Sequence, residues 1–255
     1  MKNRLLDLVY DNSLIERLWK EKPDLFIRPE NIGGKYLEET KSTTILALKY
    51  DDGVVAASDG QATSGDGVIG FDKFDKLIQV EKHTIIAIAG APTIALQICQ
   101  MMKAEIRIWN KTYSNKLSTE GKISRLSAIM RKNMAMLQAG IVVVPIYITF
   151  EPENNKGRIF QFEPTGSHVE REFHSEGSGG RYAKTVIAAN LLGKFGQLSR
   201  EKAVKLAIAS LVEAHRSDAM TGENLFVKVI DKNGASKVSP EEIAELQEQI
   251  KKGYK

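Results

Sequence analysis

The sequence predicts an α+β fold, in which strands and helices form separate blocks. Apolar residues alternate or run continuously over strand lengths in 44–89 and again in 142–174. In 92–137 and 180–215 they recur every three or four positions, which is typical of amphipathic helices. Short polar turns separate the strands within a block, so we expect antiparallel pairing.

Composition bounds the class of protein. A chain of 255 residues with 42% hydrophobic content is long enough for one large domain with a core. Its 36 basic and 32 acidic residues are interspersed, which favours a mixed solvated surface over a nucleic-acid partner. A single cysteine, Cys99, excludes a disulfide framework or a cysteine zinc site within one chain. With no secretory signal and no run of eighteen apolar residues, we expect a soluble cytoplasmic protein without membrane contact.

Residues 1–42 form a charged N-terminal extension ahead of the domain. Ser13 and Glu16 have the spacing of a capping box, so we expect one short amphipathic helix there and otherwise mobile chain.

The stretch 42–63 predicts the hairpin around which the domain is organised. A threonine pair opens an apolar strand that turns at 51–53 and returns to Asp59. The second strand is nearly continuous in apolar residues over 54–57, which indicates burial on both faces. We expect its end to bring Asp59 beside Thr43.

The next four elements are two strands and two helices. Strands at 77–80 and 84–89 pair across a Glu-Lys-His turn. A helix starts at Pro92 and keeps its apolar spacing to Trp109, and a second helix spans 123–137 until Gly140 ends it. Three antiparallel strands follow at 142–150, 157–162 and 169–174. Two helices then span 180–193 and 200–215, and Ser199 is the expected N-cap of the second. The chain ends with a strand at 225–230, closed by an Asp-Lys-Asn-Gly turn, and a helix from Pro240.

Several motifs resemble one known family. Thr43, Thr44, Gly53 and Asp59, at these spacings, resemble the start of the mature β subunit of the proteasome. The DGQAT run that begins at Asp59 also resembles the bacterial HslV peptidase, and GKISRLSAIMRKNMAMLQAG at 121–140 is most similar to the actinobacterial-type β subunit. From Thr43 onward, the resemblance covers nearly the whole chain.

The resemblance implies the N-terminal-nucleophile hydrolase fold. This fold is a four-layer αββα sandwich of two antiparallel sheets between helical layers, and the order of blocks described above is the one expected for it. The resemblance also makes 1–42 a propeptide and 43–255 a peptidase domain. A permanent docking arm for a neighbouring subunit is the other interpretation of 1–42.

A threonine at a newly made N-terminus can act as nucleophile and base. Its hydroxyl is a poor nucleophile unless a base lies within hydrogen-bond reach, and one such base is the free α-amine of the same residue. That amine has an ordinary pKa of about 7.7 to 8.0, so it can take up and return a proton near neutral pH. For Thr43, this chemistry requires cleavage directly after Ser42.

The resemblance implies three supporting residues near Thr43. Lys76, which precedes an apolar strand with Gly90 fourteen residues later, looks like the active-site lysine, and Asp59 would pair with it. Seventeen positions separate Asp59 from Lys76, one more than in the family pattern, so Lys73 remains a second candidate. Gly90 would direct its N–H toward the developing oxyanion, where a side chain would crowd the substrate.

A second group of site residues follows from the same resemblance. Ser178, in the GSGG run, would bond near the threonine amine, and the SDAMTG segment supplies Asp218 and Thr221, with threonine in place of the commoner serine. The pocket for the substrate residue before the cut would be formed by uncharged side chains: Ala62, Thr63, Phe74, Ile78, Ile88 and Pro92. The four histidines lack ligand spacing, so we expect neither a metal nor a cofactor.

These motifs predict a threonine endopeptidase made as a precursor and activated by autocatalytic cleavage. The resemblance implies seven-membered homo-oligomeric β rings stacked in pairs, α-type rings, an ATP-dependent unfoldase and unfolded protein substrates. One alternative is a catalytically silent ring subunit that keeps its extension; the presence of Lys76 argues against it, whereas Ser42, where the family usually has glycine, argues for it. The other alternative is a small-molecule amidohydrolase of the same fold.

Overall fold

The computed structural model describes residues 43–63, 69–71, 73–193 and 196–253. The expected helix near Ser13 and the rest of the extension lie outside these residues. No helix in the described part of the chain is long and apolar enough to cross a membrane.

The first of two large sheets contains the predicted hairpin. Its strands are antiparallel in the order β10-β1-β2-β11-β12. Their bounds are β1 Thr44–Tyr50, β2 Gly53–Asp59, β10 Phe173–Gly177, β11 Leu225–Asp231 and β12 Gly234–Lys237. All seven residues of β2 are buried, as its continuous apolar sequence predicts.

The second large sheet is also antiparallel, in the order β5-β6-β7-β8-β9. Its strands are β5 Leu77–Glu81, β6 Thr84–Gly90, β7 Val143–Glu151, β8 Lys156–Phe162 and β9 His168–Arg171. A short 3-10 helix, η4 Pro152–Asn154, joins β7 to β8. A separate small pair consists of β3 Ala62–Thr63 and β4 Ile69–Phe71.

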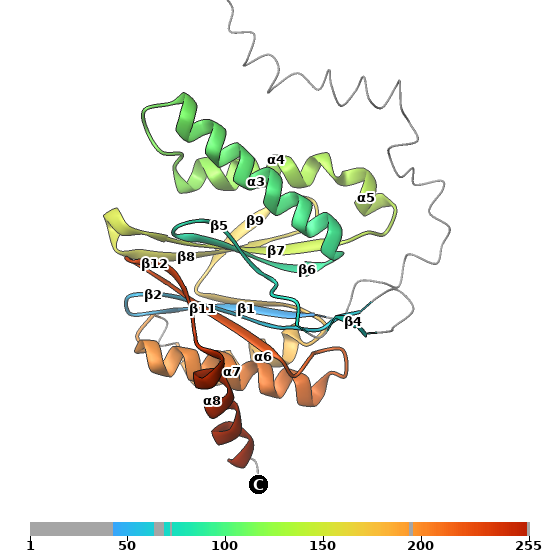
Figure 1. Cartoon of the computed structure of the whole chain (residues 1–255), viewed down its shortest axis with the longest axis vertical. Coiled ribbons are helices and arrows are strands. Elements are labelled where there is room, and N and C mark those ends of the chain that lie inside the picture. Colours follow the sequence, from blue (N-terminus) through green and yellow to red (C-terminus); the bar gives the residue numbers. More distant parts are fainter. Residues whose placement is uncertain (1–42, 64–68, 72, 194–195, 254–255) are drawn as a thin grey trace, which may run out of the picture.

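Helices cover the outer face of each large sheet, which gives four layers (Figure 1). Outside the second sheet lie α3 Pro92–Thr112, α4 Thr119–Lys132 and α5 Met134–Gln138. Outside the first lie α6 Gly180–Leu191 and α7 Arg200–Ser217, with α8 Pro240–Lys252 packed against α7. The αββα sandwich of the sequence analysis is therefore confirmed.

Three apolar clusters hold the layers together. Leu46, Leu48 and their neighbours on the first sheet pack against α6 and α7, and a second cluster joins the other sheet to α3 and α4. Between the sheets lie Ile45, Ala47 and other aliphatic side chains from both. The alternation of strand residues explains this division, because successive side chains of β1 point to opposite faces.

Two predicted elements are wrong in extent. The single helix predicted at 123–137 is interrupted at Asn133, whose side-chain amide donates to the Ile129 carbonyl oxygen at 2.9 Å, so the chain forms α4 and then α5. The single strand predicted at 169–174 is two strands in different sheets, since β9 pairs with β8 and β10 pairs with β1. The chain crosses from one sheet to the other at Glu172, whose carbonyl oxygen accepts the Lys49 N–H of β1.

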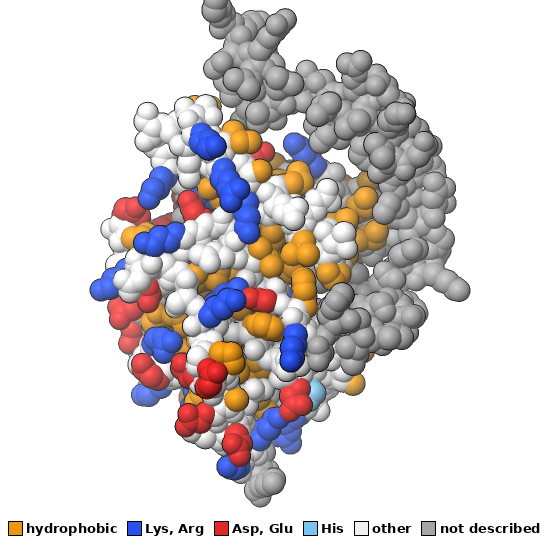
Figure 2. All heavy atoms as spheres, viewed as in Figure 1, with side chains coloured by type: hydrophobic (Ala, Val, Ile, Leu, Met, Phe, Trp, Pro, Cys, Tyr) orange, Lys and Arg blue, Asp and Glu red, His pale blue; other side chains and the backbone are white. Residues whose placement is uncertain are grey.

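A predicted helix cap, three short strands and the surface charge can also be compared with the sequence-based predictions. Ser199 caps α7 through a hydrogen bond from the Lys202 N–H, as predicted. The strands β3, β4 and β12 were not predicted. Basic and acidic side chains are both spread over the face in Figure 2, consistent with a mixed surface.

Candidate active site

Six of the predicted catalytic residues meet at one edge of the first sheet: Thr43, Asp59, Lys76, Ser178, Asp218 and Thr221. In the antiparallel order, Thr44 at the start of β1 lies opposite Gly177 at the end of β10, and Asp59 at the end of β2 lies opposite Leu225 at the start of β11. Thr43, just ahead of β1, is buried, with 6% of its surface exposed. The hairpin thus returns Asp59 to the threonine pair.

The Asp59 carboxylate is fully buried and accepts four hydrogen bonds. Oδ1 accepts the Thr44 N–H at 2.7 Å and the Lys76 ammonium at 2.6 Å. Oδ2 accepts the N–H groups of Gln61 at 3.1 Å and Gly222 at 2.9 Å. Because a buried carboxylate is costly unless it is paired and hydrogen-bonded, this set of donors is what makes Asp59 tolerable at the sheet edge.

Lys76 is the lysine that contacts this carboxylate. It is 2% exposed, directly before β5, whereas Lys73 is exposed to solvent. Burial lowers the pKa of the Lys76 ammonium, and the charge and hydrogen bond of Asp59 oppose that shift. The Lys76 ammonium and the Thr44 N–H share one acceptor, Asp59 Oδ1, and this shared contact holds a cation beside the threonine pair.

A second carboxylate, Asp218, is also connected to the threonine pair through hydrogen bonds. Its Oδ2 accepts the hydroxyls of Ser178 at 2.5 Å and Thr221 at 2.8 Å. The Thr221 hydroxyl lies 2.8 Å from that of Thr44, and the Ser178 N–H donates to the Thr43 carbonyl oxygen at 2.9 Å. These contacts connect the Asp218 carboxylate to the backbone of Thr43 and to the side chain of Thr44.

Two glycines, Gly177 beside Thr43 and the predicted site residue Gly90 at the end of β6, are required by close backbone approach. Gly177 has φ +97°, and a Cβ there would meet the Thr43 carbonyl oxygen at 1.9 Å. Gly90 has φ +102°, and a Cβ there would meet the Val142 carbonyl oxygen at 2.1 Å. A side chain at position 90 would therefore first collide with the neighbouring strand, a reason different from the crowding of substrate expected from the sequence.

The residues predicted to form the substrate pocket are only partly described. Phe74 and Ile78 are half-buried and pack against the apolar cluster that contains buried Ile88. Pro92 is exposed at the first turn of α3. Ala62 and Thr63 form β3, and their side chains lie outside the described part of the structure.

Most of the sequence matches a known family model. Residues 39–230 match the family described as proteasome subunit. The chain belongs to the proteasome family. The match begins four residues before Thr43 and ends in β11, so it includes both carboxylate networks.

Curated relatives point to the β type of proteasome subunit. A protein named proteasome subunit beta from Acidothermus cellulolyticus is 32% identical over 254 residues, covering 93% of this chain and 86% of the relative. Proteasome subunit beta 2 of Thermomonospora curvata is 32% identical, covering 82% of this chain and 76% of its own. Proteasome subunit beta of Streptomyces griseus is 30% identical, with 84% and 78% covered. The resemblance to actinobacterial β subunits is therefore confirmed.

Several residues of this proteasome-family site were missed from the sequence. Gln61 and Gly222 donate to Asp59 through backbone N–H groups, which any residue except proline possesses, so residue type carries no signal. Thr44 was recognised only as part of the motif, yet its N–H and hydroxyl connect the two carboxylate networks. The position of Thr44 directly after the predicted nucleophile was the signal in the sequence that could have identified it as a site residue.

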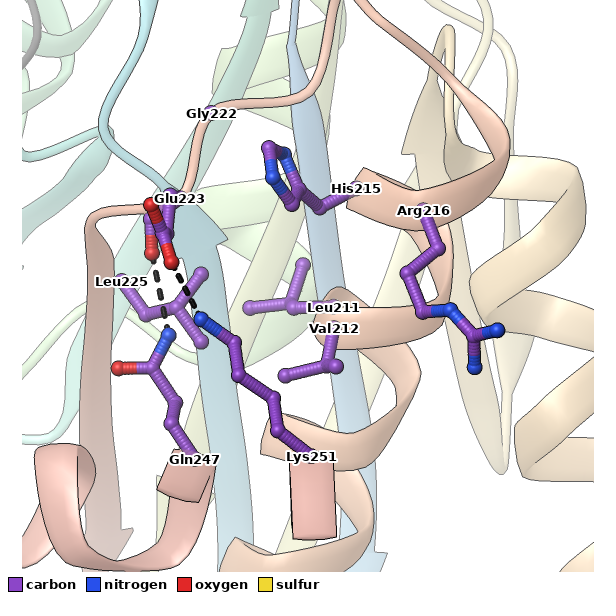
Figure 3. Close-up of a pocket in the computed structure, with 9 residues that line it drawn as sticks. All are labelled: Leu211, Val212, His215, Arg216, Gly222, Glu223, Leu225, Gln247 and Lys251. Carbon is purple, nitrogen blue, oxygen red and sulfur yellow. Dashed lines mark hydrogen bonds and ion pairs between the residues drawn. The ribbon is translucent and has the colours of Figure 1, made fainter. Parts of the chain in front are cut away.

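A cavity of about 280 Å³ borders the site but is separate from it. Figure 3 shows it between α7, the start of β11 and α8, with Gln247 and Lys251 directed toward Glu223. Leu211, Val212 and Leu225 give it an apolar wall. None of the sequence-predicted site residues lines it, so we do not assign it as the substrate pocket.

The described side chains offer no metal site. No group of three or more His, Cys, Asp or Glu residues among them is arranged to hold an ion. The ring of His215 instead contacts the Thr221 carbonyl oxygen at 2.6 Å, and that of His174 contacts Glu176 at 2.9 Å.

Proposed function

We propose that this proteasome-family chain is a threonine-type endopeptidase, with Thr43 as its nucleophile after removal of residues 1–42. The observation that supports this most directly is the position of Thr43. It directly precedes Thr44, whose N–H shares the Asp59 carboxylate with the buried Lys76 ammonium. A lysine buried with only one carboxylate partner is costly to maintain, and a structural subunit has no physical need for it beside a threonine.

Activation begins on the precursor. The Thr43 hydroxyl attacks the Ser42 carbonyl carbon, the bond from that carbon to the Thr43 nitrogen breaks, and the nitrogen takes a proton. Water then hydrolyses the resulting ester, which releases 1–42 as a carboxylic acid and restores the hydroxyl. The product has a free amine on Thr43, which is the base that the hydroxyl needs.

Peptide hydrolysis uses the same hydroxyl. The amine accepts the hydroxyl proton as the oxygen attacks the substrate carbonyl carbon, and it returns that proton to the leaving amine. The Gly90 N–H stabilises the developing oxyanion, and the Lys76 cation favours the neutral form of the amine. Ser178 and Asp218 hold the Thr43 backbone during these steps, and water finally hydrolyses the acyl ester.

The cellular setting follows from the family. We infer paired homo-oligomeric seven-membered rings in the cytoplasm, joined to α-type rings and supplied with unfolded protein by an ATP-dependent unfoldase. A closed chamber of this kind would keep a nucleophile of low intrinsic selectivity away from folded proteins.

Fluorogenic peptide hydrolysis by the assembled protein tests the proposal. The wild type should cleave peptides with an apolar residue before the cut, and Thr43→Ala should reduce the rate to background. Thr112→Ala, which changes an exposed threonine at the end of α3, should keep full activity. A wild type that assembles but hydrolyses nothing and retains 1–42 would support the silent ring subunit instead.

A further inference from the structure

Lys228 is a buried cation in the layer between the two sheets. It lies on β11 between Phe226 and Ile230, and alternation directs all three toward the apolar cluster that separates the sheets. Its side chain is only 10% exposed. A charge in such a layer is costly unless its donors are satisfied, so its contacts indicate what it does there.

The Lys228 ammonium contacts the segment that carries Lys76. Nζ donates to the Leu77 carbonyl oxygen at 2.5 Å and lies 2.8 Å from Asp75 Oδ2. The other Asp75 oxygen, Oδ1, accepts the Leu77 N–H at 3.0 Å. Lys228 and Asp75 therefore fix the residues on both sides of Lys76, and the Lys76 carbonyl oxygen accepts the Ile88 N–H at 3.0 Å.

Two lysines thus connect the sheets in opposite directions. Lys76 extends from the start of β5 to Asp59 at the end of β2, and Lys228 extends from β11 back to the start of β5. Figure 1 shows β5 and β11 in different sheets, and β11 is the direct neighbour of β2. The two contacts together fix the position of Lys76 relative to β2, the strand that ends at Asp59.

We propose that Lys228 is a positioning residue, which acts with Asp75 to hold the Lys76 ammonium in register with Asp59 and Thr43. This inference rests on the proposed threonine peptidase function. Groups that act on a reacting centre must be held to within about 0.5 Å, and a misplacement of about 1 Å can cost 100-fold in rate. The Lys228 ammonium contacts Asp75 and Leu77, the two neighbours of Lys76 in the chain, so its effect passes through Lys76.

The distinguishing readout is the pH profile. A well-placed cation favours the neutral form of the Thr43 amine and lowers its pKa. If Lys76 is displaced, the pKa of the Thr43 amine should rise, so the acidic limb of the pH profile of kcat/KM should move to higher pH. A residue that only stabilises the fold would change the amount of folded particle and leave this limb in place.

The experiment compares Lys228→Met with wild type in the full-length, assembled protein. We expect Lys228→Met to lower kcat by about 10- to 100-fold, with little change in KM for an apolar fluorogenic peptide, and to slow removal of 1–42. Asp75→Asn, which keeps an acceptor for the Leu77 N–H, should show a smaller loss in the same direction. The matched control is Lys237→Met, because Lys237 is the exposed cross-strand neighbour of Lys228 and should behave as wild type.

The outcomes separate this inference from the proposed function. The positioning role is wrong, and the proposed function stands, if wild type is active and folded Lys228→Met keeps the wild-type kcat and the wild-type acidic limb of the pH profile. If Lys228→Met does not fold, the same result for folded Asp75→Asn decides the question. If wild type and all variants lack activity, both are wrong. Thermal unfolding and gel filtration of each variant supply the folded fraction.

Discussion

Lys76 is the residue on whose placement the proposed chemistry depends most. We expect Lys76→Ala to lower peptide hydrolysis by about 100- to 1,000-fold with the fold intact, because it removes a preorganised charge from the reacting centre. Asp59→Asn should have the same effect in milder form, since it weakens the hold on the ammonium. Steady-state rates and circular dichroism of the purified variants check both.

Lys73→Ala is the matched control for this prediction. Lys73 is exposed and is the second candidate from the sequence. It should keep most activity. An inactive Lys73→Ala beside an active Lys76→Ala would exclude the assignment of Lys76.

We expect substrate preference to be set by the individual side chains of the predicted pocket. Phe74, Ile78 and Ile88 are uncharged and part of one apolar cluster, so the residue before the cut should be apolar. Burial of a leucine or aromatic side chain there is worth about 1.5 to 3 kcal/mol, whereas an unpaired charge costs more than that. A fluorogenic peptide series checks this, and a preference for acidic or basic residues would contradict the pocket assignment.

At this scale the sequence predicted residue types better than contacts. Lys76, Asp59 and Asp218 act through charged side chains, so the resemblance to the family was sufficient to identify them. Gly222 acts through its backbone N–H and Lys228 through a contact across two sheets, and neither follows from local pattern. Such contacts depend on tertiary packing of segments more than 150 positions apart.

At the scale of elements, Arg158 of β8 connects three parts of the second sheet and its helical cover. It forms ion pairs with Glu120 of α4 at 2.6 Å, Glu151 of β7 at 3.0 Å and Glu170 of β9 at 2.9 Å. Its guanidinium also lies 4.7 Å from the ring centre of Phe160. The edge strand β9 is therefore attached to the sheet by charge as well as by backbone pairing.

Removal of Arg158 should destabilise the protein in a pH-dependent way. Hydrogen bonds from Arg158 lower the pKa of Glu170 and of Glu120, so their contribution to stability is present above the unfolded-state pKa of about 4.3 and lost as pH falls through the lower folded-state value. Arg158→Met should cost about 1 to 2 kcal/mol at pH 7, because partly exposed pairs contribute less than about 1 kcal/mol each. Urea unfolding across pH measures this.

The difference in stability between wild type and Arg158→Met should therefore shrink progressively as the pH falls below about 4.3. Arg171→Met is a suitable control, since Arg171 is exposed and its guanidinium donates to the neutral Gln161 side chain. A gap between wild type and Arg158→Met that stays constant down to pH 3 would contradict the charge explanation.

Periodicity predicted the elements well but not their interruptions. The apolar spacing of Met130, Met134 and Leu137 continues through Asn133, so the pattern gave no sign that the helix ends there. The strand pattern likewise runs through Glu172 although the chain changes sheets, because alternation reports burial and not the identity of the neighbouring strand. Short strands such as β12 lack enough residues to show a period.

At the scale of the whole molecule, the four-layer sandwich brings six of the predicted catalytic residues together around the start of β1: Thr43, Asp59, Lys76, Ser178, Asp218 and Thr221. The block order and the family resemblance together were sufficient to predict this architecture. Thr43, directly before this strand, must become a chain terminus, because only then does it have a free amine of its own to act as base.

The N-terminus of the active, assembled protein tests this requirement most directly. Intact mass and N-terminal sequencing should find a species that lacks residues 1–42 and begins at Thr43, while Thr43→Ala should remain full length. Active particles that begin at Thr44, at Ser42 or at an uncut Met1 would contradict the account.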